Sequence, residues 1–221
     1  MFDLRDRLIW GVSALAVVLA FVVFDGKDWL LLCASLVGVT SLIFNARGYA
    51  VGQALMVVFS CLYGIISYRF AYYGEMATYL GMTGPMALAA LISWIRHPYK
   101  GGRQVEVNRI GRLEICLMFV VAVPVTVVFW FILSALGTAN IVPSTVSVTT
   151  SFIAVYLTFR RSEFFALAYA ANDVVLIVLW VLAALESSQY WSVAVCFVAF
   201  LFNDFYGFIR WRRMRVLQGA A

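Results

Sequence analysis

Two Asn-Asp pairs lie inside long apolar segments of this chain. Asn172 and Asp173 fall within FFALAYAANDVVLIVLW, and Asn203 and Asp204 follow thirty-one residues later within VAFLFNDFYGFIRW. An Asp at the centre of a membrane-spanning helix costs about 2.5 to 3.5 kcal/mol, so such side chains usually face the inside of a helix bundle and have a function. An amide both donates and accepts hydrogen bonds. The pairs therefore indicate recognition of a hydrogen-bonding solute.

The two residues of each pair are expected to have different roles, because neighbours on a helix point about 100° apart. We expect Asn172 and Asn203 to contact the solute, and Asp173 and Asp204 to hold loops, backbone or neighbouring helices. The two segments are joined by the short connection ESSQY. Antiparallel packing would therefore bring the two pairs near each other.

Aromatic and polar side chains follow the same helical periodicity. Tyr169 and Trp180 lie at i−3 and i+8 from Asn172 and could supply aromatic faces beside it. A second stripe lies in the third apolar segment, where spacings of seven, three and four place its members on one side of a helix. These residues are Gln53, Ser60, Tyr63 and Ser67.

The sixth apolar segment, PSTVSVTTSFIAVYLTF, carries Ser147 and Ser151 on a stripe of hydroxyl residues. Small hydroxyl residues also allow close packing of membrane helices, so packing and ligand contact both remain open for this stripe. Amide, aromatic and hydroxyl groups together describe a pocket for an uncharged, ring-containing solute. Every Lys and Arg lies in a loop or at a helix end. A phosphorylated substrate is therefore not expected, since phosphate is usually bound by such groups.

Composition identifies the class of protein that holds these residues. The chain has 221 residues, of which 64% are hydrophobic and 12% charged, against about 25% charged in ordinary soluble domains. We expect an all-α integral membrane protein in the lipid bilayer. The net charge of +5 is then explained by basic loops near anionic lipid, and it does not indicate nucleic-acid binding. Four Cys and one His lack metal-ligand spacing, so no metal or other cofactor is expected.

Eight segments approach the about 20 apolar residues that a membrane-spanning helix needs. They cover approximately 8–24, 28–45, 49–68, 77–95, 114–136, 144–159, 164–185 and 190–210. Of the sixteen Lys and Arg residues, fourteen fall on the side that holds both termini and two on the other. Basic residues favour the cytoplasmic side, so we expect both termini in the cytoplasm.

The order of the segments predicts an internal duplication within a single transmembrane domain. An extra helix (8–24) precedes a three-helix bundle (28–95), a linker helix (114–136) and a second three-helix bundle (144–213). One extra crossing between the bundles gives them the same orientation, which is a parallel repeat. Trp94 and Trp211 lie four positions after the small residues Ala90 and Gly207, at the cytoplasmic rim. Unrelated helical bundles also have interfacial Trp, so this match is weak alone.

Several motifs in order resemble the PnuC family of bacterial vitamin transporters, which are best known for nicotinamide riboside. They are YRFAYYGE, PMALAALISWIRHP, FIAVYLTFRRSEFFALAYAANDVVLIVLW and FLFNDFYGFIRWRR. The resemblance implies a three-plus-one-plus-three fold related to the SWEET sugar transporters, often with an additional N-terminal helix. It also implies a homotrimer in the bacterial cytoplasmic membrane, facilitated diffusion, and trapping of the vitamin by a cytoplasmic kinase.

The resemblance also bears on the site. Asn172 and Asn203 match positions where the family commonly has substrate-contacting Asn. This chain has Phe165 and Ala168 where the family often has a Trp-x-x-Trp pair, and Ala87 where it often has Gln. Relatives carry thiamine, riboflavin or deoxyribonucleosides, so these remain alternatives to nicotinamide riboside.

Other classes of function are also open. A proton-coupled carrier would use Asp173 or Asp204 as a titrating group. An intramembrane enzyme could use the same two residues as a carboxylate dyad, but their contexts lack Gly-rich elements and the spans contain no His. Glu75, in YYGEM, is either a gate or entry-site ligand or, as we expect, a solvated loop acid.

Overall fold

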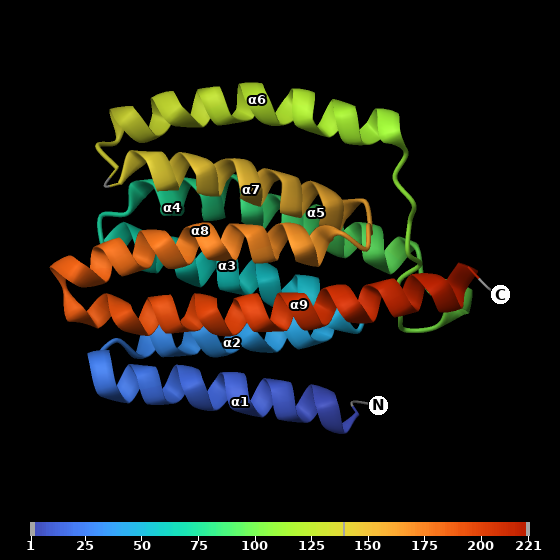
Figure 1. Cartoon of the computed structure of the whole chain (residues 1–221), viewed down its shortest axis with the longest axis horizontal. Coiled ribbons are helices and arrows are strands. Elements are labelled where there is room, and N and C mark those ends of the chain that lie inside the picture. The colour runs from blue at the N-terminus through green and yellow to red at the C-terminus, as the bar shows by residue number, and fades with distance from the viewer. Residues whose placement is uncertain (1–2, 139, 220–221) are drawn as a thin grey trace.

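The computed structural model describes residues 3–138 and 140–219, and these form a bundle of long helices (Figure 1). Within this part of the chain, eight helices are long and apolar enough to cross a membrane, as the sequence predicts. They are Leu4–Asp25, Trp29–Ala46, Val51–Arg69, Tyr73–Arg96, Arg112–Ala135, Ile141–Phe159, Phe165–Glu186 and Ser188–Gly219.

Six of the spans are built mainly from one α-helix each. The first is α1 (Leu4–Ala20), which continues as a π-helical turn, η1 (Phe21–Asp25). The others are α2 (Trp29–Ala46), α3 (Val51–Arg69), α6 (Arg112–Ala135), α7 (Ile141–Phe159) and α8 (Phe165–Glu186). The last span joins a short 3-10 turn, η4 (Ser188–Tyr190), to α9 (Trp191–Gly219). Another 3-10 turn, η3 (Tyr99–Gly101), lies in the longest loop.

The fourth span is interrupted near its middle. It consists of α4 (Tyr73–Thr78), a π-helical turn η2 (Tyr79–Thr83) and α5 (Gly84–Arg96). Pro85 follows this turn, and its ring nitrogen cannot donate the bond that a regular α-helix would require. The backbone N–H of Gly84 donates to the Tyr79 carbonyl, five residues earlier. Such wide turns are frequent at functional sites.

Six spans pack as a closed ring. Going round it, α2 contacts α3, α3 contacts α5, α5 contacts α7, α7 contacts α8, α8 contacts α9, and α9 contacts α2. Two spans lie outside the ring on opposite flanks, α1 against α2 and α9, and α6 against α7 and α4 (Figure 1). Their outward faces carry large exposed apolar side chains, which suits contact with lipid.

Equivalent hydrogen bonds relate the two halves of the ring. The Trp94 indole donates to the Thr158 carbonyl over 2.9 Å, and the Trp211 indole donates to the Asn45 carbonyl over 2.8 Å. Asn45 and Thr158 are each the last residue but one of their helix, α2 and α7. Both bonds are therefore what a parallel duplication of α2–α5 and α7–α9 would produce.

The equivalence extends to the two outer helices. Arg47, just after α2, pairs with Asp6, the third residue of α1. Arg160, just after α7, pairs with Glu114, the third residue of α6. Each outer helix is thus tied at the same place to the first ring helix of its half.

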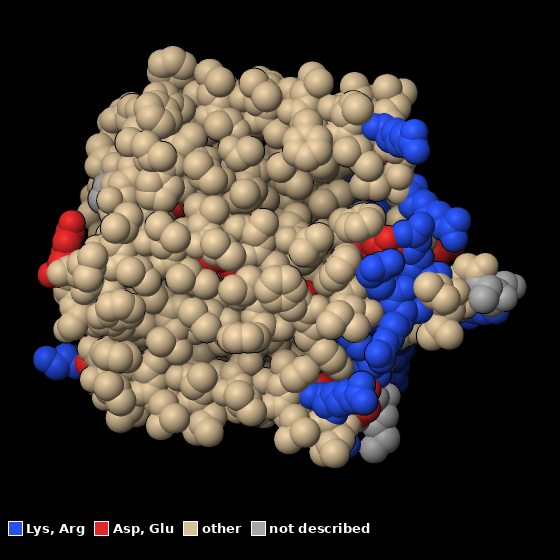
Figure 2. All heavy atoms as spheres, viewed as in Figure 1, with Lys and Arg blue, Asp and Glu red and all other residues tan. Residues whose placement is uncertain are grey.

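Charged side chains gather at one end of the molecule. Figure 2 shows Lys and Arg concentrated at the end where both described termini lie, beside an almost uncharged body. Helix α9 has 29 residues, or about 43 Å at 1.5 Å per residue, which exceeds the about 30 Å of a bilayer's hydrocarbon core. Its arginine-rich last part therefore projects beyond the bilayer at the charged end.

Candidate functional site

Three carboxylic acids are buried in the interior of the bundle. Glu75 is 0% exposed, Asp173 3% and Asp204 4%. Burying a carboxyl group in an apolar interior is costly unless partners compensate for lost water. The neighbours of each acid therefore indicate what it does.

The expectation that Glu75 is a solvated loop acid is wrong. It lies in the first turn of α4, and this turn is covered by its neighbours. A Cβ on the adjacent Gly74 would come within 2.8 Å of Leu133 in α6 and of Thr138. Ser147 of α7 donates to Glu75 Oε1 over 3.3 Å. The other carboxyl oxygen, Oε2, has no hydrogen-bond partner among the described residues.

Aromatic rings from three spans meet beside Glu75. The ring centre of Tyr63 in α3 lies 4.5 Å from that of Tyr79 in η2 and 6.2 Å from that of Trp180 in α8. Trp180 also packs against Tyr72, with ring centres 4.8 Å apart. Tyr79 follows Glu75 by four residues in the same helical span, so the two side chains share a face, and α3, which carries Tyr63, packs against α4. The acid and the rings thus form one buried group.

Several polar atoms in the interior have no hydrogen-bond partner in the described part of the chain. The Tyr63 hydroxyl lies near the Trp180 indole N–H, yet neither completes a hydrogen bond. The same holds for atoms on one face of α3 and in η2, namely Ser60 Oγ, Ser67 Oγ and Thr83 Oγ1. Each such atom costs about 1 to 3 kcal/mol when unsatisfied, and most buried polar groups in proteins are bonded. We call Ser60, Tyr63, Glu75, Tyr79, Thr83 and Trp180 the central cluster.

Asn172 lies at the interface of α7 and α8. Its Oδ1 accepts hydrogen bonds from Thr150 Oγ1 over 2.7 Å and from Ser151 Oγ over 3.1 Å. Its amide nitrogen makes no hydrogen bond within the described residues. A donor thus remains available beside Ser151, which hydrogen-bonds to the same side chain.

Asp173 and Asp204 face each other across α8 and α9. Their carboxyl groups lie close enough to influence each other, and Asp173 Oδ2 has no hydrogen-bond partner among the described residues. The two Asn-Asp pairs are therefore close together, as the short connection between the helices implies. That the two Asp residues hold loops, backbone or neighbouring helices stays a prediction.

Asn203 points in another direction. Its amide nitrogen donates to Ser13 Oγ of α1 over 2.8 Å and to the Ala199 carbonyl over 2.7 Å. The amide nitrogen thus binds the outer helix α1, while the amide oxygen has no hydrogen-bond partner among the described residues. The site that we propose below therefore leaves Asn203 out.

Gln53 and the two rim tryptophans lie near the charged end. The Gln53 amide donates to Asn45 Oδ1 over 2.8 Å, and the Asn45 carbonyl accepts the Trp211 indole. Trp94 and Trp211 pack with ring centres 5.3 Å apart, and Phe165 packs against both. These side chains close the charged end of the ring below the central cluster.

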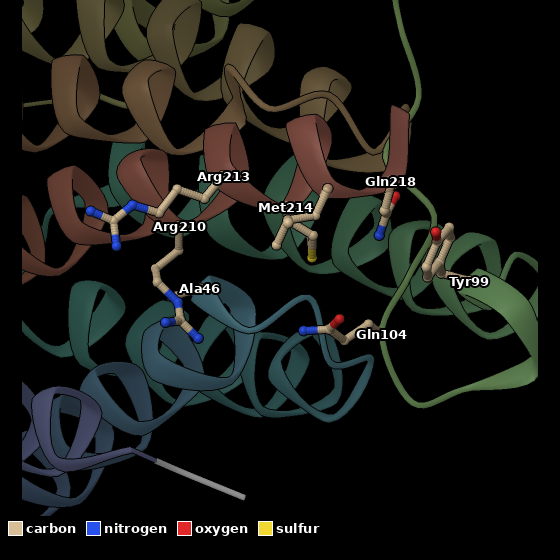
Figure 3. A pocket seen from close by; sticks show the side chains of 8 residues that line it. Ala46, Tyr99, Gln104, Arg210, Arg213, Met214 and Gln218 are labelled. Carbon is tan, nitrogen blue, oxygen red and sulfur yellow. The ribbon is translucent and has the colours of Figure 1, made fainter. Parts of the chain in front are cut away.

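A surface pocket lies beyond this closure, outside the ring. It is formed by the end of α2, the last part of α9 and the long loop between α5 and α6 (Figure 3). Gln104 and Gln218 line it, and both also bond to backbone carbonyls, of Arg47 and Val105. The pocket includes Arg210 and Arg213 but none of the buried acids. It is separate from the central cluster.

Sequence reasoning missed the part of the cluster contributed by the fourth span. Tyr79 and Thr83 were not singled out, because YLGMTGP has no polar periodicity. The Gly-Pro step is the one local signal, since it marks a break in the helix. Among the described residues, no group of three or more His, Cys, Asp or Glu could hold a metal ion.

Comparisons with known proteins agree on one family. The family model described as "Nicotinamide mononucleotide transporter" matches residues 28–213. A protein of Neisseria mucosa named "Nicotinamide riboside transporter PnuC" is 26% identical over 212 residues, which cover 93% of this chain and 80% of that protein.

A solved structure shares the fold. It is described as "Crystal structure of the Vitamin B3 transporter PnuC", and it superposes with a TM-score of 0.86 at 22% identity. The match covers 99% of this chain and 94% of the solved chain. Since the family model spans most of the chain, this multi-pass membrane protein belongs to the nicotinamide mononucleotide transporter family and is a transporter, not an enzyme.

Proposed function

We propose that this protein carries nicotinamide riboside across the bacterial cytoplasmic membrane. The observation that carries the proposal is the central cluster, whose unpartnered polar atoms lie deep among apolar helices. A riboside brings a carboxamide and ribose hydroxyls, which are partners for such atoms. The named relative that covers 93% of this chain supports the same substrate.

The charge distribution favours the riboside over the mononucleotide. A phosphate is usually held by Arg or Lys. All sixteen Lys and Arg residues of this chain lie in loops or towards helix ends, and none is near the central cluster in the described part of the chain. A phosphorylated nucleotide would therefore lose its water without gaining a cationic partner.

The proposed contacts follow from the donors and acceptors that remain. The amide nitrogen of Asn172 and the indole N–H of Trp180 can donate to substrate oxygens. The hydroxyls of Ser60 and Tyr63 can donate or accept. Ser147 and Ser151 support the site from α7, through Glu75 and Asn172 respectively.

We further propose facilitated diffusion, with both termini in the cytoplasm and a cytoplasmic kinase that traps the riboside by phosphorylation. The concentration of basic residues at one end supports this orientation (Figure 2). The family resemblance supports the kinase, the homotrimer and the absence of coupling to an ion gradient. The two bundles (28–95 and 144–213) would move against each other around the site.

Uptake into proteoliposomes tests the proposal. We expect labelled nicotinamide riboside to enter by counterflow and an excess of unlabelled riboside to compete, while nicotinamide mononucleotide, thiamine, riboflavin and thymidine compete weakly. An imposed pH gradient should leave the rate unchanged. Faster uptake under a proton gradient would favour the carrier in which Asp173 or Asp204 titrates. Strong competition by one of the other compounds would mean that this compound, and not nicotinamide riboside, is the substrate.

A further inference from the structure

Glu75 has a carboxyl group with no cationic partner in its surroundings. Among the described residues, its carboxyl group forms no ion pair with any Lys or Arg and accepts one hydrogen bond, from Ser147. A charged carboxylate buried in this way is stable only with a compensating positive charge or additional hydrogen bonds. Glu75 therefore lies where a cation in the pathway would be favoured.

The rings beside Glu75 are of the kind that binds cations. The faces of Tyr and Trp attract a positive charge placed within about 6 Å of the ring centre. Tyr63, Tyr79 and Trp180 come from three different spans. The Tyr63 ring packs against both the Tyr79 ring and the Trp180 ring. Glu75 on the face of Tyr79, with the ring contacts continuing through Tyr63 to Trp180, combines a charge partner with aromatic faces in a water-poor setting.

The riboside that we propose as substrate carries such a charge. Its nicotinamide ring nitrogen bonds to the ribose carbon as well as to two ring carbons, so the ring is a pyridinium cation. From the sequence we expected an uncharged solute because the spans lack Lys and Arg. That lack disfavours an anion, but it does not disfavour a cation, and the burial of Glu75 was not visible in the sequence.

We propose that Glu75 and the rings of Tyr63, Tyr79 and Trp180 form a cation subsite that selects the positively charged ring of the substrate. This inference rests on the proposed function and deepens it. Glu75 acts as a specificity-determining residue: it favours a pyridinium ring over a neutral ring of the same size. The hydroxyl of Tyr63 and the indole N–H of Trp180 remain free for the polar substituents of the ring.

A pair of ligands that differ in ring charge tests the subsite. Nicotinamide riboside has the charged ring, and 1,4-dihydronicotinamide riboside has nearly the same shape with a neutral ring. Calorimetry on the purified full chain should show that Glu75→Gln weakens binding of the charged riboside by about tenfold or more. Binding of the neutral riboside should change by less than about threefold. Counterflow uptake should follow the same order.

Matched variants make the result specific. Glu186→Gln makes the same chemical change at an exposed position at the end of α8, and it should leave both affinities unchanged. Tyr79→Leu removes one ring and should again weaken the charged ligand more than the neutral one. Tyr79→Leu also serves as the test if Glu75→Gln does not fold, as judged by its thermal unfolding midpoint.

The outcomes separate this inference from the proposed function. Equal losses for both ligands in Glu75→Gln, or no loss for either, would overturn the cation subsite while uptake of the riboside stands. If the wild-type protein does not carry the riboside but carries thiamine, another ring cation, in a Glu75-dependent way, the substrate is wrong and the subsite stands. Failure of the wild-type protein to bind any ring cation would overturn both.

Discussion

Asn172 and Asn203 have the same sequence context but different neighbours, so matched substitutions distinguish their roles. We expect Asn172→Leu to abolish binding of nicotinamide riboside with folding retained, because Thr150 has other acceptors in the carbonyls of Val146 and Ser147. Asn203→Leu should leave affinity unchanged and lower stability by about 1 kcal/mol, through loss of its bond to Ser13. Calorimetry and thermal unfolding measure the two effects. Unchanged affinity in Asn172→Leu would remove this residue from the site.

The contact between Asp173 and Asp204 makes a second prediction. Because the two buried carboxyl groups influence each other across α8 and α9, Asp204→Asn keeps a polar group with a donor and an acceptor there and should retain folding and uptake. Asp204→Leu leaves Asp173 buried with no partner across the interface and should lower stability by about 1 to 3 kcal/mol. Denaturation in detergent compares the two variants. Loss of uptake in a stably folded Asp204→Asn protein would instead indicate that the carboxyl group itself takes part in transport.

Residue types were easier to predict than the directions in which they point. The cost of burying a polar group in a span predicts that both Asn-Asp pairs are inward-facing, and Asn172, Asp173, Asn203 and Asp204 are all buried. The direction of Asn203 depends on α1, which lies against α9 although it is about 190 residues away in sequence. The burial of Glu75 depends likewise on how α6 covers the first turn of α4. Both the direction of Asn203 and the burial of Glu75 depend on contacts between helices, which the periodicity of a single helix cannot predict.

The two helices outside the ring are tied to it by equivalent ion pairs that differ in burial. Asp6 of the Arg47 pair is fully buried at its side chain, whereas Glu114 of the Arg160 pair is 24% exposed. Burial of the Arg47 guanidinium lowers its pKa, but the hydrogen bond and the negative charge of Asp6 outweigh burial and raise the pKa above its ordinary value. We expect Arg47→Gln to cost about 3 kcal/mol or more and Arg160→Gln about 1 kcal/mol or less.

Thermal unfolding of the two variants compares these costs in the same detergent. Arg47→Gln should also expose α1 to limited proteolysis, because Asp6 would then be buried with the Tyr206 hydroxyl as its remaining side-chain partner. Equal losses of stability in the two variants would mean that the two ion pairs contribute equally, although the Arg47–Asp6 pair is more buried than the Arg160–Glu114 pair.

The spans themselves were predictable because their signal is local. About 20 consecutive apolar residues make a spanning helix whatever its neighbours are, so all eight were found. The π-helical turn at Tyr79–Thr83 was not, although it places Tyr79 and Thr83 in the central cluster. Gly84 and Pro85 indicate a break in the span, but the form of the break depends on the close approach of α3 at Ser60, whose Cβ would lie 3.4 Å from a Cβ on Gly84.

At the scale of the whole molecule, the two halves share their rim contacts but differ in the position of their buried acids. The rim bonds of Trp94 and Trp211 match, as do the ion pairs that hold α1 and α6. The buried acids do not match: Glu75 lies near one end of the fourth span, whereas Asp204 lies well inside α9. The site that we propose is therefore asymmetric within two similar halves, which suits the proposed substrate with a charged ring at one end and a sugar at the other.

The orientation of the whole molecule gives the last prediction. Figure 2 shows the basic side chains gathered at one end. By the order of the spans, fourteen of the sixteen Lys and Arg residues lie on the side of the long loop that contains Lys100, and basic loops stay in the cytoplasm. In intact cells, an impermeant maleimide should label Glu186→Cys, at the opposite end of the helices, and should not label Lys100→Cys until the membrane is broken. The native cysteines lie within apolar spans and give the background through the unsubstituted chain. Labelling of Lys100→Cys from outside would show the opposite orientation, and the proposed trapping by a cytoplasmic kinase would then require release of the riboside at the other end of the ring.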